Sequence, residues 1–149
     1  MAVRVQVEDF NVGDEIKRLQ GSRKDIGAVV SFVGLVRDIN DGDAVAQLTL
    51  EHYPGMTEKS LSKIVEQAKA RWNIVDVLVI HRVGTLQPCD QIVLVAVAGA
   101  HRGEAFAACE FVMDYLKTEA PFWKKEQTPS GERWVEAKES DDSAKARWN

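Results

Sequence analysis

A nearly continuous apolar run at residues 28–36 constrains the fold of this chain most strongly. The run is rich in valine and contains Phe32, and both residue types favour β-strands. A strand that is apolar on both faces is typical of the interior of a sheet. The sequence therefore predicts a central strand from Ala28 to Val36, buried on both faces and ending at Arg37.

Apolar patterns elsewhere in the chain predict further strands. The polar turn at 38–43 and the break at 52–55 separate some of them. We expect the two long strands in the middle of the chain to be antiparallel neighbours, and the last two to form a hairpin. The predicted strands are a short edge strand at 3–7, a strand at 47–51, the long pair at 75–83 and 91–98, and the final pair at 122–127 and 133–137.

Capping residues and apolar positions spaced three and four apart predict three helices. Asn11 caps a brief helix that runs to about Leu19 and ends at Gly21. Thr57 caps a long helix, and Pro121 ends a third one over about residues 104–118. The inward positions are Leu61, Ile64, Val65, Ala68 and Trp72 in the second helix, and Phe106, Cys109, Val112, Met113 and Leu116 in the third.

The length of 149 residues gives room for a single hydrophobic core. The mixture of strands and helices predicts one α+β domain with a mainly antiparallel sheet over residues 1–137. The charged segment at residues 138–149 is expected to be a polar, flexible tail.

Charge and cysteine content exclude several classes of protein. The chain has 19 basic and 23 acidic residues, a net charge of −4, so we expect no general nucleic-acid-binding surface. No apolar window is long enough for a membrane helix, and the N-terminus lacks the features of a secretory signal, so a cytoplasmic location is expected. Cys89 and Cys109 form no metal-binding motif or disulfide framework, and a thiol role for either stays open.

His101 and Arg102 lie in a predicted turn that leads from a strand into a helix. Free backbone N–H groups and the helix dipole attract anions there, and Arg102 can hold a phosphate through two hydrogen bonds. The turn therefore predicts a phosphate or carboxylate pocket. The alternative is that Arg102 is a solvated surface residue and His101 a local hydrogen-bonding group.

Lys117 and Lys124 form a second candidate site, which Lys125 and Glu126 adjoin. Lys117 ends a predicted helix and Lys124 lies in the strand after Pro121, so the chain can fold back and bring both amines to one pocket. Lys124 and Glu126 share a face of that strand, because side chains alternate. A lysine beside another cation has a lowered pKa, which suits proton transfer. The alternative is that both lysines are solvated, one of them complementing a helix dipole.

Other chemistry-bearing residues give weaker signals. Arg37, at the end of the apolar strand, either faces a pocket or reaches solvent. Asp141 and Asp142 sit in the polar tail, where we expect no acid–base role. The aromatic side chains of Phe122, Trp123, Trp134 and Trp148 could stack on a flat heterocycle. Packing of the terminal hairpin is the simpler explanation for Phe122, Trp123 and Trp134.

Several sequence blocks, read together, resemble one known family. The blocks are FVGLVRD, LEHYPGMTEK, IHRVG, AHRG, DYLKTEAPFWKKE and GERWVEA. The chain resembles the large, catalytic subunits of molybdopterin synthase from about residue 28 to the C-terminus, and more loosely in the first strand. The resemblance implies an α/β-hammerhead-like domain with an added antiparallel sheet. It also implies that cyclic pyranopterin monophosphate is converted to molybdopterin with two dithiolene sulfurs.

The resemblance also implies partners and residue roles. The sulfur comes from the C-terminal thiocarboxylate of a small ubiquitin-like subunit, and the large subunits form the central homodimer of a heterotetramer. No cofactor and no metal are implied for this subunit. Lys138 stands where relatives can carry arginine, so it receives no role. The implied catalytic residues are Lys117 and Lys124, and the implied substrate contacts are Leu35, Val36, Arg37, His101, Arg102, Lys117, Lys124, Lys125 and Glu126.

Other functions compete with this interpretation. A non-catalytic module could bind a pterin or another small phosphate together with a ubiquitin-like protein, through the same anion pocket. A purely structural oligomer would leave the lysines solvated. A lysine enzyme that uses pyridoxal phosphate is chemically conceivable, but the chain resembles no such family. In a dimer, His101 and Arg102 could also serve the neighbouring protomer's pocket.

Overall fold

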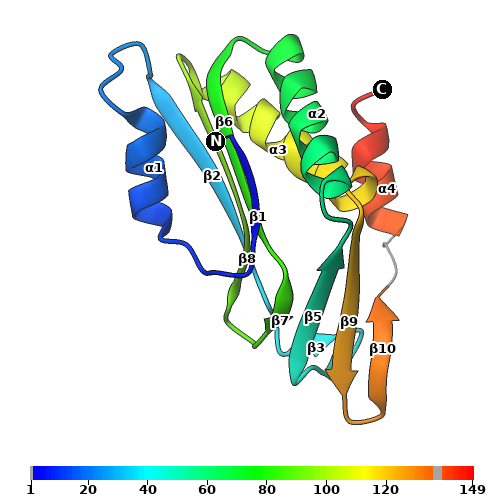
Figure 1. The fold of residues 1–149 in the computed structure, drawn as a ribbon. Helices are drawn as coiled ribbons and strands as arrows, with labels where there is room; N and C mark the ends of the chain where they lie inside the picture. The colour runs from blue at the N-terminus through cyan, green and yellow to red at the C-terminus, as the bar shows by residue number, and fades with distance from the viewer. Residues whose placement is uncertain (1, 136–138) are drawn as a thin grey trace.

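The computed structural model describes residues 2–135 and 139–149, and within these residues the chain forms two four-stranded sheets and four helices (Figure 1). The architecture is α+β with an additional antiparallel sheet, as expected. In chain order the elements are β1 (Val3–Gln6), α1 (Val12–Gln20), β2 (Ala28–Leu35), β3 (Ile39–Asn40), β4 (Asp43–Ala44), β5 (Gln47–His52), α2 (Met56–Arg71), β6 (Ile74–Arg82), β7 (Gly84–Leu86), β8 (Gln91–Gly99), α3 (Arg102–Glu119), β9 (Phe122–Thr128), β10 (Gly131–Val135) and α4 (Glu139–Ala146).

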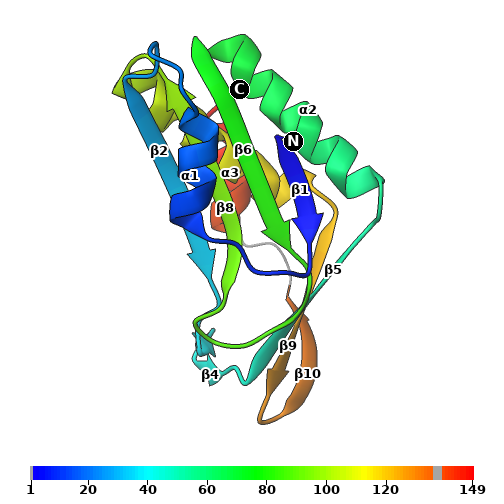
Figure 2. The ribbon, with the colours of Figure 1, turned by 60° about the vertical axis from the view of Figure 1, so that its left-hand side comes forward.

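The first sheet has the strand order β1-β6-β8-β2 and is covered on both faces. Helices α2 and α3 lie on one face and α1 on the other (Figures 1 and 2). The predicted antiparallel pairing of the two long central strands is confirmed, since β6 pairs with β8. The larger core lies between this sheet and α2 and α3, where Leu61, Val95 and Phe111 are almost fully buried. A smaller core under α1 contains Phe10, Ile80 and Leu94.

Strand β2 is an edge strand, so the prediction of a central strand buried on both faces was wrong. It pairs only with β8, and Phe32 and Leu35 are 41% and 52% exposed. The apolar run shows that these residues favour a strand, but the order of strands depends on which segments pair with it. Strands β6 and β8 occupy the central positions of the sheet. Strand β2 lies at the edge and has an exposed apolar surface.

The second sheet has the order β10-β9-β5-β7 and is antiparallel throughout. The predicted hairpin at the end of the chain is confirmed by β9 and β10, although residues 136 and 137 of its second strand lie outside the described residues, as does Lys138. Strand β5 lies between β9 and β7. The sequence did not predict β7, which has only three residues.

Helix α1 begins as predicted, with the Asn11 side chain accepting a hydrogen bond from the Asp14 N–H at 3.0 Å. The cap of α2 differs from the prediction, because the N-cap is Gly55 and not Thr57. The Thr57 side chain is fully buried instead. Its hydroxyl accepts a hydrogen bond from the Tyr53 N–H and donates one to the Pro121 carbonyl, both at 3.0 Å. Thr57 thus connects the start of α2 to the segment that joins α3 to β9.

The C-terminal part of the chain contains a helix where the sequence predicted a frayed tail. Helix α4 packs on α3, and the Trp148 indole that follows it donates a hydrogen bond to Asp114 at 2.7 Å. The Trp148 ring contacts Trp72 and Phe111 edge to face, at 5.4 and 5.7 Å between ring centroids. Phe106 of α3, predicted to face inward, is 60% exposed. The remaining predicted inward residues of α3 are buried.

Candidate active site

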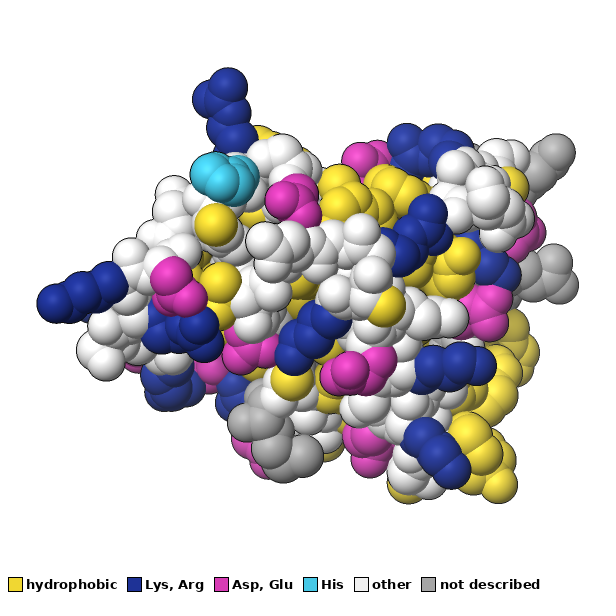
Figure 3. All heavy atoms as spheres, turned by 90° about the horizontal axis from the view of Figure 1, so that it is seen from above, with side chains coloured by type: hydrophobic (Ala, Val, Ile, Leu, Met, Phe, Trp, Pro, Cys, Tyr) yellow, Lys and Arg dark blue, Asp and Glu magenta, His cyan; other side chains and the backbone are white. Residues whose placement is uncertain are grey.

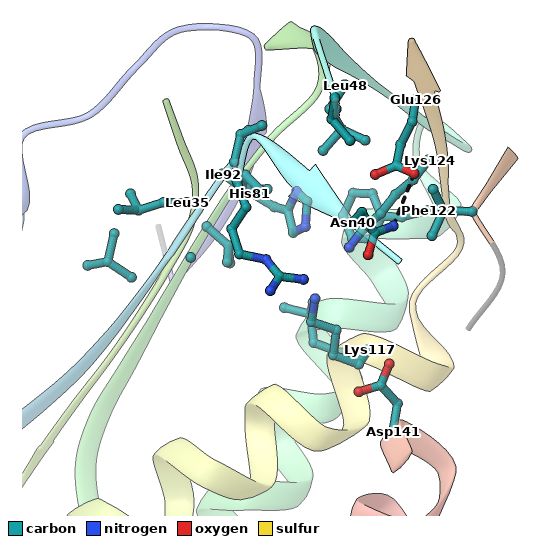
Figure 4. A pocket seen from close by; sticks show the side chains of 18 of the residues that line it. Leu35, Asn40, Leu48, His81, Ile92, Lys117, Phe122, Lys124, Glu126 and Asp141 are labelled. Atoms are coloured by element: carbon teal, nitrogen blue, oxygen red, sulfur yellow. Dashed lines mark hydrogen bonds between the residues drawn. The ribbon is translucent and has the colours of Figure 1, made fainter. Parts of the chain in front are cut away.

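A cavity of about 600 Å³ lies where the two sheets and the C-terminal end of α3 meet (Figure 4). Among the residues that the structure describes, its wall combines apolar side chains with three cations, two carboxylates and one imidazole. The polar and aromatic part of the lining includes Arg37, Asn40, His81, Lys117, Phe122, Lys124, Glu126 and Asp141.

Lys117 and Lys124 both line this cavity, as the sequence predicted. Lys117 lies in the last turn of α3, and Lys124 is the third residue of β9. Burial and the neighbouring charge of Lys117 lower the pKa of Lys124 to about 8. A fraction of the Lys124 side chains is therefore neutral at physiological pH, whereas a solvated lysine would be fully charged.

The alternation of side chains along β9 turns Phe122, Lys124 and Glu126 toward the cavity. Glu126 is 5% exposed, and its Oε1 accepts hydrogen bonds from Asn40 Nδ2 at 3.0 Å and from Arg133 Nε at 3.2 Å. These two donors satisfy a carboxylate that would otherwise be costly to bury. Glu126 therefore supports the cavity wall.

Arg133 of β10 holds the small hairpin of β3 and β4 against β9. Its Nη1 donates to Asp43 Oδ2 at 2.7 Å and its Nη2 donates to the Asn40 carbonyl at 3.0 Å. At the tip of this hairpin, Asp41 and Gly42 have φ values of 52° and 81°, the backbone conformation of a tight two-residue turn. The sequence predicted only a polar turn here. The hairpin contributes part of the cavity wall through Asn40.

Leu35, Val36 and Arg37 also line the cavity, where the sequence placed them at the end of the apolar strand. Val36 is buried and Arg37 is exposed at the mouth. This end of β2 therefore meets the two lysines in a single site.

Three predicted site residues do not line the cavity. The Lys125 side chain lies on the other face of β9, where it pairs with Glu132 at 3.3 Å and covers the Trp134 ring. His101 is the N-cap of α3 and Arg102 its first residue, so about 22 Å of helix separates them from Lys117. One chain does not bring the His101–Arg102 turn and the lysine pair together.

Two titratable residues of the described cavity lining, His81 and Asp141, were not predicted from the sequence. His81 lies near the end of β6. Two signals were available: its position after the apolar run at 77–80 and its place in the block IHRVG. Asp141 was assigned to a solvated tail, but α4 carries it to the cavity (Figure 4). Its charge opposes the lowering of the Lys124 pKa.

Neither cysteine lines the cavity. Cys109 is buried in the core, and burial raises the pKa of its thiol to about 11, so it stays protonated and is a poor nucleophile. Cys89 is exposed in the turn before β8. The arrangement thus supplies cations and proton donors, but no sulfur nucleophile of its own at the cavity.

Among the described side chains of residues 2–135 and 141–149, no three His, Cys, Asp or Glu are grouped so that they could hold a metal ion. No helix in this part of the chain has the length and apolarity to cross a membrane. The end of the molecule shown in Figure 3 has basic and acidic side chains interspersed, with no continuous basic surface on that face.

Comparison with known proteins identifies close relatives. The family model of the MoaE protein matches residues 5–119. The "Molybdopterin synthase catalytic subunit" of Ralstonia nicotianae is 66% identical over 146 residues, which are 98% of this chain and 83% of the relative. The solved "Molybdopterin biosynthesis MoaE protein" of Burkholderia ambifaria is 58% identical, with a TM-score of 0.85 over 99% of this chain and 98% of that one.

A more distant structure shares the fold. It is the "Protein-protein complex of subunit 1 and 2 of Molybdopterin-converting factor" from Helicobacter pylori. The identity is 22%, and the TM-score is 0.73 over 93% of this chain and 92% of that chain.

Proposed function

This chain belongs to the MoaE family of molybdopterin synthase catalytic subunits, and from that premise we propose that it installs the two dithiolene sulfurs of molybdopterin. The substrate is cyclic pyranopterin monophosphate. The sulfur donor is the C-terminal thiocarboxylate of a small ubiquitin-like subunit. The observation that carries this proposal is a cavity in which Arg37, Lys117 and Lys124 gather beside a flat aromatic wall.

The composition of the cavity supports this chemistry in two ways. A cyclic phosphate and a thiocarboxylate are both anions, and three cations surround the space that they would occupy. No cysteine lines the cavity, so a sulfur-inserting reaction there needs sulfur delivered by another molecule.

We assign different roles to the two lysines. Lys117 transfers protons and stabilises the oxyanion that forms during attack by sulfur. Lys124 holds the substrate and the developing negative charge. Asp141 and Glu126 balance part of the positive charge around Lys124, since both raise its pKa against the effect of Lys117.

The partners in this proposal are the small sulfur-carrier subunit and a second copy of the chain. The H. pylori protein of the same fold was solved as a complex of two subunits. Exposed Phe32 and Leu35 on the edge strand β2 are the kind of apolar surface that a subunit interface covers. The distance of His101 and Arg102 from their own cavity favours action in the neighbouring protomer's pocket.

Single-turnover formation of molybdopterin tests the proposal. The assay combines this protein, cyclic pyranopterin monophosphate and the thiocarboxylated small subunit, and compares the wild type with Lys117→Ala. Removal of a general acid–base group should slow product formation about 10²- to 10⁴-fold. Lys63→Ala is the matched control, because Lys63 is an exposed lysine on α2 outside the cavity.

Each outcome has a distinct meaning. Product from the wild type and from Lys63→Ala, with little from Lys117→Ala, would support both the reaction and the role of Lys117. Full turnover by Lys117→Ala would support the proposed reaction but show that Lys117 is not needed for it. If even the folded, partner-bound wild type made no product, the non-catalytic binding module would become the better interpretation.

A further inference from the structure

His81 lies in the wall of the cavity, and nothing in the proposed reaction yet uses it. The side chain is buried, with 3% of its surface exposed. Its ring stacks on the Phe122 ring, with 3.8 Å between centroids and 19° between planes (Figure 4). Phe122 belongs to the same face of β9 as Lys124, so the imidazole is fixed next to the lysine pair.

Hydrogen bonding fixes which ring nitrogen carries the proton. His81 Nδ1 lies 2.8 Å from the backbone carbonyl oxygen of Arg82. A carbonyl only accepts, so Nδ1 must be the protonated donor and Nε2 carries the lone pair in the neutral ring. Nε2 has no hydrogen-bond partner among the described side chains of residues 2–135 and 141–149, nor is it a fully buried atom. It is therefore open to a ligand in the cavity.

The surroundings keep this imidazole neutral. Burial is the largest effect, and together with the charges of Lys124 on β9, Lys117 on α3 and His52 on β5 it lowers the pKa of His81 to about 3. The bond to the Arg82 carbonyl acts in the opposite direction. Glu126 and Asp141 also line the cavity, but neither forms an ion pair with His81.

We propose that His81 Nε2 is a substrate-positioning acceptor, which receives a hydrogen bond from an N–H or O–H group of the pterin bound in the cavity. The inference rests on the proposed function for the identity of that ligand. The charged arginine and lysine side chains of the cavity, Arg37, Lys117 and Lys124, donate hydrogen bonds and bind the anionic part of a substrate. A neutral acceptor in the same wall recognises the donor-bearing ring system and sets its orientation.

The recognition that follows is selective. A site built around a buried acceptor rejects ligands that lack the matching donor, because the acceptor would then lose its contact with water without compensation. His81 would therefore discriminate pterins from other small cyclic phosphates that satisfy the three cations equally well. The aromatic face of Phe122 keeps the imidazole plane in place during this contact.

Nitrogen-15 NMR of the histidine rings tests this inference in the intact protein. The chain has only three histidines, so the ring resonances of His81 can be assigned by comparison with one variant. At pH 7 we expect a protonated Nδ1 and an unprotonated Nε2. Addition of cyclic pyranopterin monophosphate should move the Nε2 resonance upfield, as expected for a new hydrogen bond. Sulfate, an anion without a donor at this pH, should leave it in place.

Kinetics of two variants supply a readout that a structural role would not give. His81→Phe keeps a stacking ring but removes the acceptor, and should raise KM for the pterin about three- to tenfold with a smaller change in kcat. His81→Gln restores an acceptor oxygen and should recover part of the affinity. Thermal unfolding of both variants shows whether the fold is retained.

Several results would overturn the inference. These are an imidazolium or an Nε2-protonated ring at pH 7, an Nε2 resonance that ignores the pterin, or an unchanged KM in a folded His81→Phe. An active wild type with an unresponsive Nε2 would contradict only the role of His81. A wild type that neither turns over nor shifts Nε2 would contradict the proposed function as well.

Discussion

Lys124, on β9, is buried beside Lys117, on α3, and burial together with the charge of Lys117 lowers the pKa of Lys124 to about 8. The two amines come from different elements, and the turn through Pro121 brings them to one cavity. The positive charge of Lys117 thus makes it easier for Lys124 to lose its proton. This relationship gives the site a dependence on pH that isolated lysines would show only near pH 10.

The first prediction concerns that pH dependence. Lys124 is protonated below its pKa, and the proposed role requires the ammonium, so the single-turnover rate should fall as the pH rises through about 8. In Lys124→Arg the cation persists to much higher pH, so any remaining activity should lack this decrease. The measurement is the single-turnover rate from pH 6 to 10 in both proteins. A rate that rises through pH 8 would mean that the neutral amine is the active form.

The second prediction concerns the remote pair His101 and Arg102. If they complete the neighbouring protomer's pocket, a hybrid dimer of one Lys117→Ala chain and one Arg102→Ala chain contains one intact pocket. Two affinity tags allow this hybrid to be purified. It should show about half of the wild-type activity, while each pure variant is strongly impaired. A hybrid as inactive as its parents would place all these residues in one chain's pocket. A fully active Arg102→Ala dimer would instead remove Arg102 from the site.

The third prediction concerns Thr57, whose buried hydroxyl joins Tyr53 to Pro121. Thr57→Val has nearly the same shape but removes the partner of the Tyr53 N–H and of the Pro121 carbonyl in a partly buried setting. It should lower the free energy of unfolding by about 1–3 kcal/mol. Thr57→Ser keeps the hydroxyl and serves as the control, with a smaller loss. Urea denaturation measures both, and equal stability of Thr57→Val and the wild type would contradict this account.

The fourth prediction concerns Glu126, which accepts hydrogen bonds from Asn40 and Arg133. Glu126→Ala should destabilise the protein by about 1–3 kcal/mol and raise KM, because the β3–β4 hairpin loses its attachment to β9. Glu132→Ala removes an exposed carboxylate from the next strand and should cost less than about 1 kcal/mol. Calorimetry and steady-state kinetics distinguish the two. Similar losses in both variants would show that burial of Glu126 is unimportant.

Much of the secondary structure could be predicted from the sequence, because local patterns determine it. Asn11 and Gly21 mark α1, and alternation marks β9 and β10. The edge position of β2 could not be predicted in this way, since strand order depends on pairing with distant segments. Helix α4 was missed because its stability comes from tertiary packing, including that of Trp148 on Trp72.

The candidate site was predictable to a similar extent. Lys117 and Lys124 could be brought together on the sequence alone, since a short connection with one proline separates their elements. His81 and Asp141 are distant in sequence from both lysines, and only the folded chain brings them to the cavity. The sequence correctly placed His101 and Arg102 at the N-terminus of α3. The length of α3 separates these two residues from the lysines.

The alternation of β9 also limits how the length of this segment can vary. A deletion or insertion of one residue between Phe122 and Glu126 would direct the side chains of Trp123 and Lys125 into the cavity. The side chains of β9 that now line the cavity would then point away from it. A change of two residues would preserve the orientation of the strand. Natural or engineered variants can therefore exchange the outward side chains freely, but their insertions and deletions in this strand should occur in even numbers.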